Sequence, residues 1–370
     1  MSETIFGILT RRARLPSACV LLTLAAIAGA LPRAALAARP SPPAVFAGTA
    51  LWVREVSSTE NGRGLAQDAA GAGVRTLYVK AADGTSPEPQ FSTTLVSEIR
   101  SAGTQVCAWT FMYGSDPTAE AAVAASAAGD GAQCLVIDAE GSADVPNLYG
   151  AAQVFVRTLR AQVGAKFPIG LASQAENTEH PTFPYSVFLG PGAFNVVLPL
   201  IYWQDFGQSV DGAYAETMTA NTIYGRPILP MGQLYGTPTP PELERFRSLA
   251  AAYGAAGLSF FDLDAAQPQQ LAALNTPLPK LPRRALTAPT VRPGADGDQI
   301  VQAQELLNAA GAHLPVGGYY GAQTAHAIAS FQARHHLTPN GILNPATWKA
   351  LLHFTPREPS WANAPPNSAR

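Results

Sequence analysis

Short apolar runs alternate with amphipathic segments along most of the chain, and this alternation restricts the possible folds more than any other feature. Between residues 45 and 275, eight runs are suited to buried strands: 48–53, 76–80, 105–111, 134–140, 168–172, 196–202, 227–231 and 257–261. Helical segments separate them, and Asp116-Pro117 and Thr239-Pro240 are typical helix starts. Strand and helix in alternation predict a parallel sheet with crossover helices, and eight such units match a closed (β/α)8 barrel. An open, doubly wound sheet is the alternative.

The composition argues against binding that depends on overall charge. Of the 370 residues 47% are hydrophobic, which suffices for a packed core, whereas 14% are charged and the formal net charge is -2. Nucleic acids and acidic membrane surfaces attract strongly basic proteins. Neither is therefore expected as a partner.

The first 37 residues have the organisation of a signal peptide. Arginines at positions 11, 12 and 14 precede an apolar stretch over residues 18–31, and the sequence A-L-A at 35–37 offers a cleavage site. Because the stretch is short for a membrane span, the mature protein is expected to be secreted and free of the membrane. An uncleaved anchor is the alternative, and the arginines leave both a general and a twin-arginine export route open.

Cleavage at that site would remove Cys19 and leave Cys107 and Cys134 in the mature protein. Both lie in predicted strands, and their spacing matches no known pairing pattern. In an exported protein they could form a disulfide, and two buried free thiols are equally consistent with the sequence.

Two segments are rich in proline and poor in large apolar residues. Residues 276–295 contain five prolines and are predicted to form a semi-rigid, extended linker. Residues 353–370 are predicted to form a disordered tail. The linker would separate the barrel, residues 45–275, from a second domain at 296–352.

That second domain has the pattern of three short helices. Its middle helix, residues 321–332, reads G-A-Q-T-A-H-A-I-A-S-F-Q, and the third follows Asn344-Pro345. The side chains predicted to close its core are Ile300, Leu307, Ile328, Phe331, Trp348 and Leu351. The pattern resembles the common peptidoglycan-binding domain of cell-wall hydrolases, a small all-α domain. This resemblance implies peptidoglycan as a partner and a location in the cell wall.

Ligand contacts in such a domain would come from exposed aromatic faces and planar polar groups, because sugars offer C–H surfaces and peptides offer amides. The candidates are Tyr319, Tyr320, Gln332 and Arg334. A metal site is not expected at His335 and His336, with His326 nearby, because their spacing provides no third ligand supported by a carboxylate. These histidines are expected to be ordinary surface residues.

In a (β/α)8 barrel, the reacting groups lie where the strands end. The run 134–140 ends with Asp138 and Glu140, and period-two geometry puts both carboxylates on one side, toward the barrel mouth. Two carboxylates at an apolar mouth separate in pKa, as glycoside hydrolysis requires. Glu140, with the longer reach, is predicted to donate the proton, and Asp138, nearer Lys80, to stay ionised. A structural salt bridge between this pair and Lys80 is the alternative.

The Asp-x-Glu ending, Glu55 after the first strand and residues 79–84 after the second together resemble family 25 glycoside hydrolases, the barrel-shaped muramidases. This resemblance implies catalysis by Glu140 and Asp138, with Glu55 standing where that family has Asp. The barrel segment also resembles an uncharacterised group of exported bacterial barrel proteins that carry the same wall-binding domain.

Further polar and aromatic residues follow the predicted strands and could bind a sugar. They are Lys80, Trp109, Tyr202, Trp203, Asp205, Gln233, Tyr235 and Asp262. His180 is the single histidine of the barrel segment, so neither a histidine zinc centre nor a Ser-His-Asp triad is expected. No glycine-rich phosphate loop follows a strand, and the sequence predicts no cofactor and no metal.

Together these features predict an exported cell-wall protein that binds peptidoglycan and hydrolyses an envelope glycan with paired carboxylates. The alternative is a wall-binding protein whose barrel holds a glycan without cutting it. Nothing in the sequence determines the oligomeric state.

Overall fold

A computed structural model describes residues 40–57, 60–140, 145, 147–175 and 180–361. The predicted signal peptide, residues 1–37, lies outside the described residues. The barrel strands are β1 (Gly48–Val53), β2 (Thr76–Asp83), β4 (Gln105–Phe111), β5 (Leu135–Asp138), β6 (Ile169–Gln174), β7 (Val196–Leu200), β8 (Met231–Gln233) and β9 (Gly257–Phe261). A short β3 (Ser86–Pro87) pairs with β2 in antiparallel fashion.

The sheet closes on itself. Its strands follow the order β1-β9-β8-β7-β6-β5-β4-β2-β3, and β1 also pairs with β2. Leu51 of β1 is the register partner of both Leu77 and Phe260, so β1 has parallel neighbours on both sides. The predicted (β/α)8 barrel is confirmed, and the open-sheet alternative is wrong.

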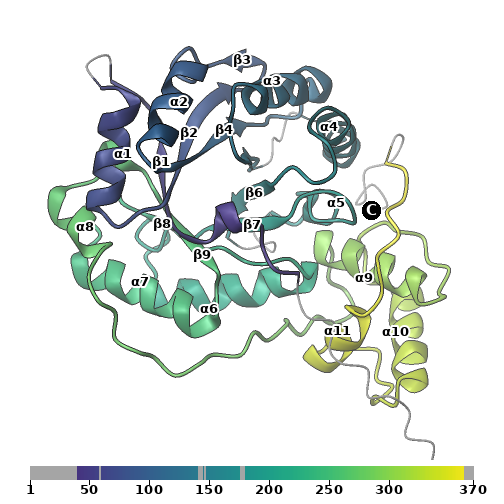
Figure 1. Cartoon of the computed structure of the whole chain (residues 1–370). Helices are drawn as coiled ribbons and strands as arrows, with labels where there is room; N and C mark the ends of the chain where they lie inside the picture. Colours follow the sequence, from purple (N-terminus) through teal and green to yellow (C-terminus); the bar gives the residue numbers. More distant parts are fainter. Residues whose placement is uncertain (1–39, 58–59, 141–144, 146, 176–179, 362–370) are drawn as a thin grey trace, which may run out of the picture. The chain divides into compact units, whose positions relative to one another are not determined.

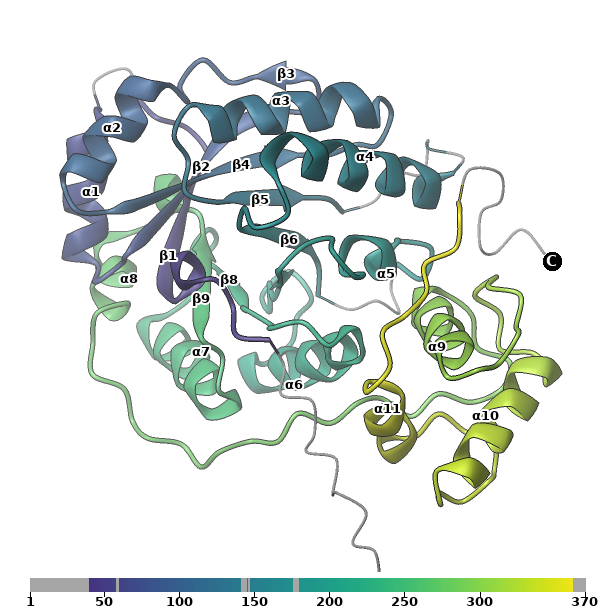
Figure 2. The same ribbon diagram turned by 45° about the vertical axis from the view of Figure 1, so that its right-hand side comes forward.

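Helices cover the outside of the strands (Figures 1 and 2). They are α1 (Gly62–Gly71), α2 (Thr93–Ser101), α3 (Pro117–Gly129), α4 (Leu148–Val163), α5 (Tyr185–Phe188), α6 (Val210–Asn221), α7 (Pro240–Tyr253) and α8 (Pro268–Ala273). Asp116 caps α3 through a hydrogen bond from the Ala119 amide, and Thr239 forms a capping box with Glu242 at α7. Both predicted helix starts are thus confirmed. Among the described residues, no helix has the length and hydropathy that a membrane span requires.

Alternating residues of each strand face two different cores, as the period of a strand demands. In β5, Leu135 and Ile137 join the cluster shared with the outer helices, whereas Val136 joins the cluster inside the barrel. The inner cluster also contains Trp52 and Trp109. Large aromatic side chains therefore fill the barrel interior below its mouth.

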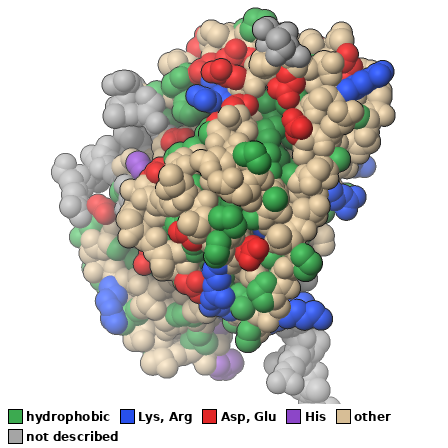
Figure 3. Space-filling view, turned by 90° about the vertical axis from the view of Figure 1, so that its left-hand side faces the viewer, with side chains coloured by type: hydrophobic (Ala, Val, Ile, Leu, Met, Phe, Trp, Pro, Cys, Tyr) green, Lys and Arg blue, Asp and Glu red, His purple; other side chains and the backbone are tan. Residues whose placement is uncertain are grey.

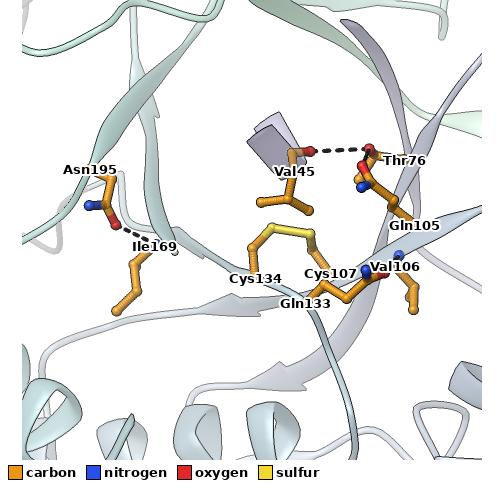
Figure 4. Close-up of a disulfide and its surroundings, with 9 residues drawn as sticks. All are labelled: Val45, Thr76, Gln105, Val106, Cys107, Gln133, Cys134, Ile169 and Asn195. Carbon is orange, nitrogen blue, oxygen red and sulfur yellow. Dashed lines mark hydrogen bonds between the residues drawn. A yellow bond between two sulfur atoms is a disulfide. The ribbon is translucent and has the colours of Figure 1, made fainter. Parts of the chain in front are cut away.

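Cys107 of β4 and Cys134, which precedes β5, form a disulfide inside the barrel (Figure 4). Both residues are fully buried, and their Cα atoms lie 4.6 Å apart. Beside them lies η1 (Ala44–Phe46), where the Val45 carbonyl accepts a hydrogen bond from the Thr76 hydroxyl at 3.2 Å. Of the two states that the sequence allowed for these cysteines, the structure has the disulfide.

The helical segment after the barrel consists of α9 (Asp298–Ala309), α10 (Ala322–Arg334) and α11 (Pro345–Leu351). The predicted core is confirmed, since each of its side chains is fully buried: Ile300, Leu307, Ile328, Phe331, Trp348 and Leu351. Before it, residues 276–290 run without helix or strand. Arg284 ties this connection to the barrel through a hydrogen bond to Asp211 Oδ1 at 3.1 Å.

Asp298, the first residue of α9, is completely buried and accepts four hydrogen bonds from the barrel. Its Oδ1 accepts from Tyr149 Oη at 2.7 Å and Ser186 Oγ at 2.6 Å, and its Oδ2 accepts from the Ser186 amide and Tyr224 Oη, both at 2.9 Å. Burial raises the pKa of Asp298 to about 6, although these hydrogen bonds oppose the rise. The contacts join α9 to α4, α5 and η2 (Thr222–Tyr224).

The chain after α11 also packs against the barrel. Trp361 is 3% exposed, and its ring centroid lies 4.8 Å from that of Tyr149. Its amide donates to Gln153 Oε1 at 3.3 Å, and its carbonyl accepts from Asn147 Nδ2 at 2.6 Å. The predicted disorder from residue 353 is therefore wrong as far as Trp361, because the indole finds a buried place on α4. Residues 362–370 lie outside the described residues.

Candidate active site

Asp138 is the last residue of β5 and Glu140 follows it by two positions, so both lie at the mouth of the barrel. The three preceding residues, 135–137, are fully buried and hold this end of the strand in the sheet. Ile137 and Ala139 belong to the outer cluster, so the alternate positions 138 and 140 face the other way. The geometry on which the sequence prediction rested is present.

Asp138 is the deeper of the two carboxylates. It is 5% exposed, and Trp109 Nε1 donates to its Oδ2 at 3.1 Å. Its Oδ1 has no hydrogen-bond partner among the described residues. Burial raises the pKa of Asp138 well above its usual range, and the charge of Glu140 raises it further. An unpartnered buried oxygen is available for a proton or for a substrate donor.

Glu140 is half-buried and therefore reachable from the mouth. Gln174 Nε2, at the end of β6, donates to Glu140 Oε2 at 2.7 Å. Burial raises the pKa of Glu140, while the charge of His180 and the Gln174 hydrogen bond lower it. Gln174 was not among the residues predicted from the sequence.

Lys80 does not form the salt bridge with this pair that was the structural alternative to catalysis. Its ammonium lies 2.9 Å from Asp83 Oδ2 and 3.9 Å from Glu88 Oε1, and 5.6 Å from the centroid of the Trp109 ring. Since its close partners are other carboxylates, the positive charge of Lys80 does not offset the burial of Asp138. Burial is the largest effect on the pKa of Asp138 and raises it, whereas the charge of Lys80 lowers it, so an ionised Asp138 stays a prediction.

Aromatic rings surround the carboxylates. Trp109 packs edge-on against Trp52 at 5.1 Å and against Phe261 at 5.6 Å between centroids. Tyr202 lies 5.3 Å from Tyr235 and is half-buried. Burial raises the pKa of the Tyr202 hydroxyl, and the charges of Asp138 and Glu140 act on it in the same direction. Trp109, Tyr202 and Tyr235 therefore belong to one cluster of aromatic rings, together with Phe261, beside the carboxylate pair.

Trp109 is nevertheless 3% exposed, so it does not offer the open stacking face that was expected of it. It instead holds Asp138 in place through its indole N–H. Tyr235 donates to the exposed Asp205, so these two predicted residues also lie together.

Two residues that were predicted to bind the substrate, Trp203 and Gln233, have structural roles instead. Trp203 is 1% exposed, donates to Glu242 Oε1 at 3.1 Å and packs on Phe246 of α7, so it faces the outer helices. Gln233 is fully buried, and its Oε1 accepts from the Gln204 amide at 3.1 Å. Trp203 and Gln233 position the segments after β7 and β8, and neither is open to a substrate.

Asp262 and Glu55 also differ from expectation. Asp262 is 3% exposed, accepts from the Ala265 amide at 3.0 Å and pairs with Arg54 at 3.3 Å. The exposed Glu55 follows β1, and its amide donates to Asp264 Oδ2 at 3.0 Å. Of the three predicted catalytic residues, Asp138 and Glu140 lie at the end of β5, whereas Glu55 follows β1.

Two exposed aromatic residues at the ends of strands were missed by the sequence prediction. Tyr113, 45% exposed, follows β4 and donates to Asp83 Oδ1 at 2.6 Å, and Phe206, 49% exposed, follows β7. Both were recognisable as aromatic residues within six positions of a strand end. They supply the open ring faces that the buried Trp109 and Trp203 do not.

Acidic and hydrophobic side chains are intermixed across the centre of the face drawn in Figure 3, and most of its Lys and Arg side chains lie toward the margin. The described residues of this face thus offer no broad basic surface to a polyanion.

In the helical segment, two of the predicted ligand residues are buried. Tyr320 is fully buried and its hydroxyl donates to the Gly341 carbonyl. Gln332 is fully buried too, with its Oε1 accepting from the Gly341 amide at 2.9 Å. Both side chains fix the turn around Gly341, because a buried polar group needs a partner. Arg334 and Tyr319 are exposed, as ligand contacts require.

Within the described residues, no group of three or more His, Cys, Asp or Glu side chains is arranged to hold a metal ion. His326, His335 and His336 are exposed.

Residues 296–351 match the family described as "Putative peptidoglycan binding domain". Over 17% of its length the chain is 33% identical to a peptidoglycan-binding protein from Clostridioides difficile, with a TM-score of 0.17, and covers 40% of that protein. Over 19% it is 40% identical to the endolysin of Burkholderia AP3 phage, with a TM-score of 0.17, and covers 26% of that protein. The chain therefore spans less than half the length of either relative.

The barrel is similar to the spore cortex-lytic enzyme SleL from Bacillus cereus, at 13% identity over 63% of this chain and 75% of that one, with a TM-score of 0.48. At these values the similarity carries no information about activity. No curated protein matches the chain. The resemblance to family 25 stays a prediction. The chain is thus a (β/α)8 barrel followed by a helical segment that matches a peptidoglycan-binding domain.

Proposed function

We propose that this protein is an exported glycoside hydrolase that binds peptidoglycan through residues 296–352 and cleaves an envelope glycan at the mouth of its barrel. The observation that supports this proposal best is the pair at the end of β5, in which burial raises the pKa values of Asp138 and Glu140. Glycoside hydrolysis needs a carboxylic acid that still holds its proton near neutral pH, beside a second carboxyl group.

Glu140 is the proton donor in this proposal because it is the accessible member of the pair. As the glycosidic C–O bond breaks, the Glu140 proton passes to the leaving oxygen and positive charge develops on the sugar ring. The negative charge left on Glu140 attracts that ring, and Gln174 stabilises it through its hydrogen bond. Water then adds to the sugar carbon and returns a proton to Glu140, which restores the enzyme.

Asp138 affects how readily Glu140 gives up its proton, because the two carboxyl groups lie at the end of the same strand. Two negative charges so close in a buried place are unfavourable, so the pair retains a proton near neutral pH. Trp109 holds Asp138 through its indole N–H, and the unpartnered Oδ1 remains for a hydrogen bond to the substrate. The half-buried Tyr202 and the exposed Tyr113 and Phe206 are proposed to pack against sugar rings.

An extracytoplasmic location is consistent with two features besides the predicted signal peptide. Residues 296–351 match a domain family whose ligand lies outside the cytoplasm, and Cys107 and Cys134 form a disulfide. Disulfides persist in oxidising compartments and are rare in the cytosol.

A binding protein without turnover is the second candidate. It is favoured by the structural roles of Gln233 and Asp262, two residues that were predicted to bind the substrate. Incubating the purified mature protein with purified peptidoglycan and analysing the soluble products by mass spectrometry distinguishes the two functions. The hydrolase releases glycan fragments with new reducing ends. Binding to the pellet with no released fragment after prolonged incubation would favour the binding protein.

A further inference from the structure

An open groove of about 570 Å³ lies on the helical segment, between the residues that follow α9 and one face of α10. From α10 it is lined by Gln323, His326, Ser330 and Arg334, which recur three or four positions apart and so share one face of the helix. Ile328 and Gln332, both fully buried, occupy the opposite face. The volume lies within the range of small-ligand sites, roughly 300–1,000 Å³.

The second wall of the groove is fixed in place. It is formed by residues 312–315, among them His313 and Leu314. Asn308 Nδ2 donates to the Leu314 carbonyl at 2.9 Å, and the Leu314 amide donates to Asn308 Oδ1 at 2.7 Å. Because Asn308 lies within α9, this pair of bonds holds the wall against a rigid element, and binding a ligand there requires little ordering of the backbone.

The polar side chains of the groove are available to a ligand. His313, Gln323, His326 and Arg334 are exposed, and in the described part of the chain their side chains make no hydrogen bond or ion pair. Structural polar residues of the same segment, such as Gln304 and Gln332, are by contrast fully engaged with their neighbours. The groove residues therefore have donor capacity that the fold does not use.

The charge around the groove favours an anion. Residues 296–352 contain three acidic residues, Asp296, Asp298 and Glu305, and none of them lines the groove. Asp298 and Glu305 are moreover buried. The guanidinium of Arg334 can pair with a carboxylate through two parallel hydrogen bonds. The groove has no aromatic lining residue on which a sugar could stack, since the exposed Tyr319 is not part of it.

We propose that this groove binds the peptide stems of peptidoglycan by their carboxylates, with Arg334 as the anchor and with His326 and His313 as further donors. Peptidoglycan offers two chemistries, glycan strands that present sugar faces and peptide stems that present amides and carboxylates. The open donors and the lack of aromatic lining match the second. This inference rests on the proposed peptidoglycan binding and specifies the part of the polymer that is recognised.

The test measures the binding of the purified full-length protein in three arms: intact peptidoglycan, glycan strands stripped of their stems by an amidase, and a synthetic stem tetrapeptide. The variants are Arg334→Ala and His326→Ala, with Lys349→Ala as the matched control, because Lys349 is exposed on α11 and is not part of the groove. Circular dichroism and thermal unfolding verify that each variant is folded.

Arg334→Ala is expected to weaken binding to intact peptidoglycan and to the tetrapeptide by about 10- to 100-fold, the usual effect of losing a charge-assisted hydrogen-bonded pair. Lys349→Ala is expected to bind like the wild type, and the wild type to bind stripped strands, which only the barrel can hold, more weakly than intact peptidoglycan. Unchanged binding by Arg334→Ala, or equal binding of stripped and intact material, would overturn the inference. A wild type that fails to pellet with peptidoglycan yet binds the tetrapeptide through Arg334 would instead contradict wall binding. If the wild type binds neither peptidoglycan nor the tetrapeptide, both the proposed wall binding and this inference are contradicted.

Discussion

Glu140 is a residue whose pKa depends on opposing effects. Burial raises the pKa, whereas the hydrogen bond from Gln174 and the charge of His180 lower it. A general acid works only while it holds its proton, so the pKa of Glu140 sets the highest pH at which the proposed reaction runs.

Replacing Gln174 with Leu should move the alkaline limb of the pH–rate profile to higher pH. The Gln174 amide stabilises the carboxylate form of Glu140, so its loss leaves burial less opposed and the pKa of Glu140 rises further. The variant therefore keeps its proton, and its activity, at a pH where the wild type has lost both. The measurement is kcat/KM against pH on soluble glycan fragments.

Gln269→Leu provides the control for this change, because Gln269 is an exposed residue of α8. Its profile should match that of the wild type. A downward movement of the alkaline limb in Gln174→Leu, or no movement, would mean that Glu140 is not the group that limits the reaction at high pH.

The sequence predicted the carboxylate pair but not its partners, for a physical reason. Alternation along one strand is a local property, so Asp138 and Glu140 could be assigned to one side from β5 alone. The position of Gln174 depends on the register between β5 and β6, in which Asp138 lies opposite Ala172 and Glu140 therefore lies near Gln174. Burial of Tyr320 and Gln332 likewise depends on the turn around Gly341, which helical periodicity does not specify.

At the scale of elements, the disulfide links β4 to the start of β5, two neighbouring strands of the barrel. It encloses a chain segment with a sequence separation of 27 that contains α3. Cross-linking a loop of this size restricts the unfolded chain more than the folded one.

The double variant Cys107→Ala/Cys134→Ala should therefore lose about 2–4 kcal/mol of unfolding free energy, a typical range for a native disulfide. Urea unfolding, followed by tryptophan fluorescence, measures the difference. A reducing agent should lower the stability of the wild type and leave the double variant unchanged. Equal stability of the two proteins without reductant would show that the cross-link contributes nothing to the fold.

The bounds of the elements were predictable where local signals were strong. The predicted strands 48–53, 105–111 and 257–261 coincide with β1, β4 and β9. The predicted strand 227–231 instead corresponds to β8 at Met231–Gln233, because Pro227 and Pro230 lack the amide that a central strand must donate. Ile228 retains only an isolated bridge to Val197.

At the scale of the whole molecule, Asp298 joins the helical segment to the barrel, and the chain up to Trp361 returns to α4. The order of the two parts along the chain could be read from the sequence, since the prolines of residues 276–295 separate two distinct patterns. Their contact could not, because it depends on pairs such as Tyr149 and Asp298 that are 149 positions apart.

Asp298→Ala should make the connection 276–295 more susceptible to proteases and lower the unfolding free energy by roughly 3 kcal/mol or more, because four buried donors lose their acceptor. Limited proteolysis followed by mass spectrometry measures the first effect. Asp68→Ala, at an exposed position of α1, is the control and should be cleaved like the wild type. Equal cleavage rates in Asp298→Ala and the wild type would contradict a stabilising role for this contact.

The rate at which Glu140→Gln releases soluble fragments from purified peptidoglycan tests the central claim most directly. The amide keeps the size of the side chain but has no acidic proton to give to the leaving oxygen. General acid catalysis contributes about 10²–10⁴-fold, so the rate should fall by at least about 100-fold. The variant should still pellet with peptidoglycan, because residues 296–351 are unchanged. A Glu140→Gln preparation that pellets and releases fragments at the wild-type rate would contradict the proposed mechanism.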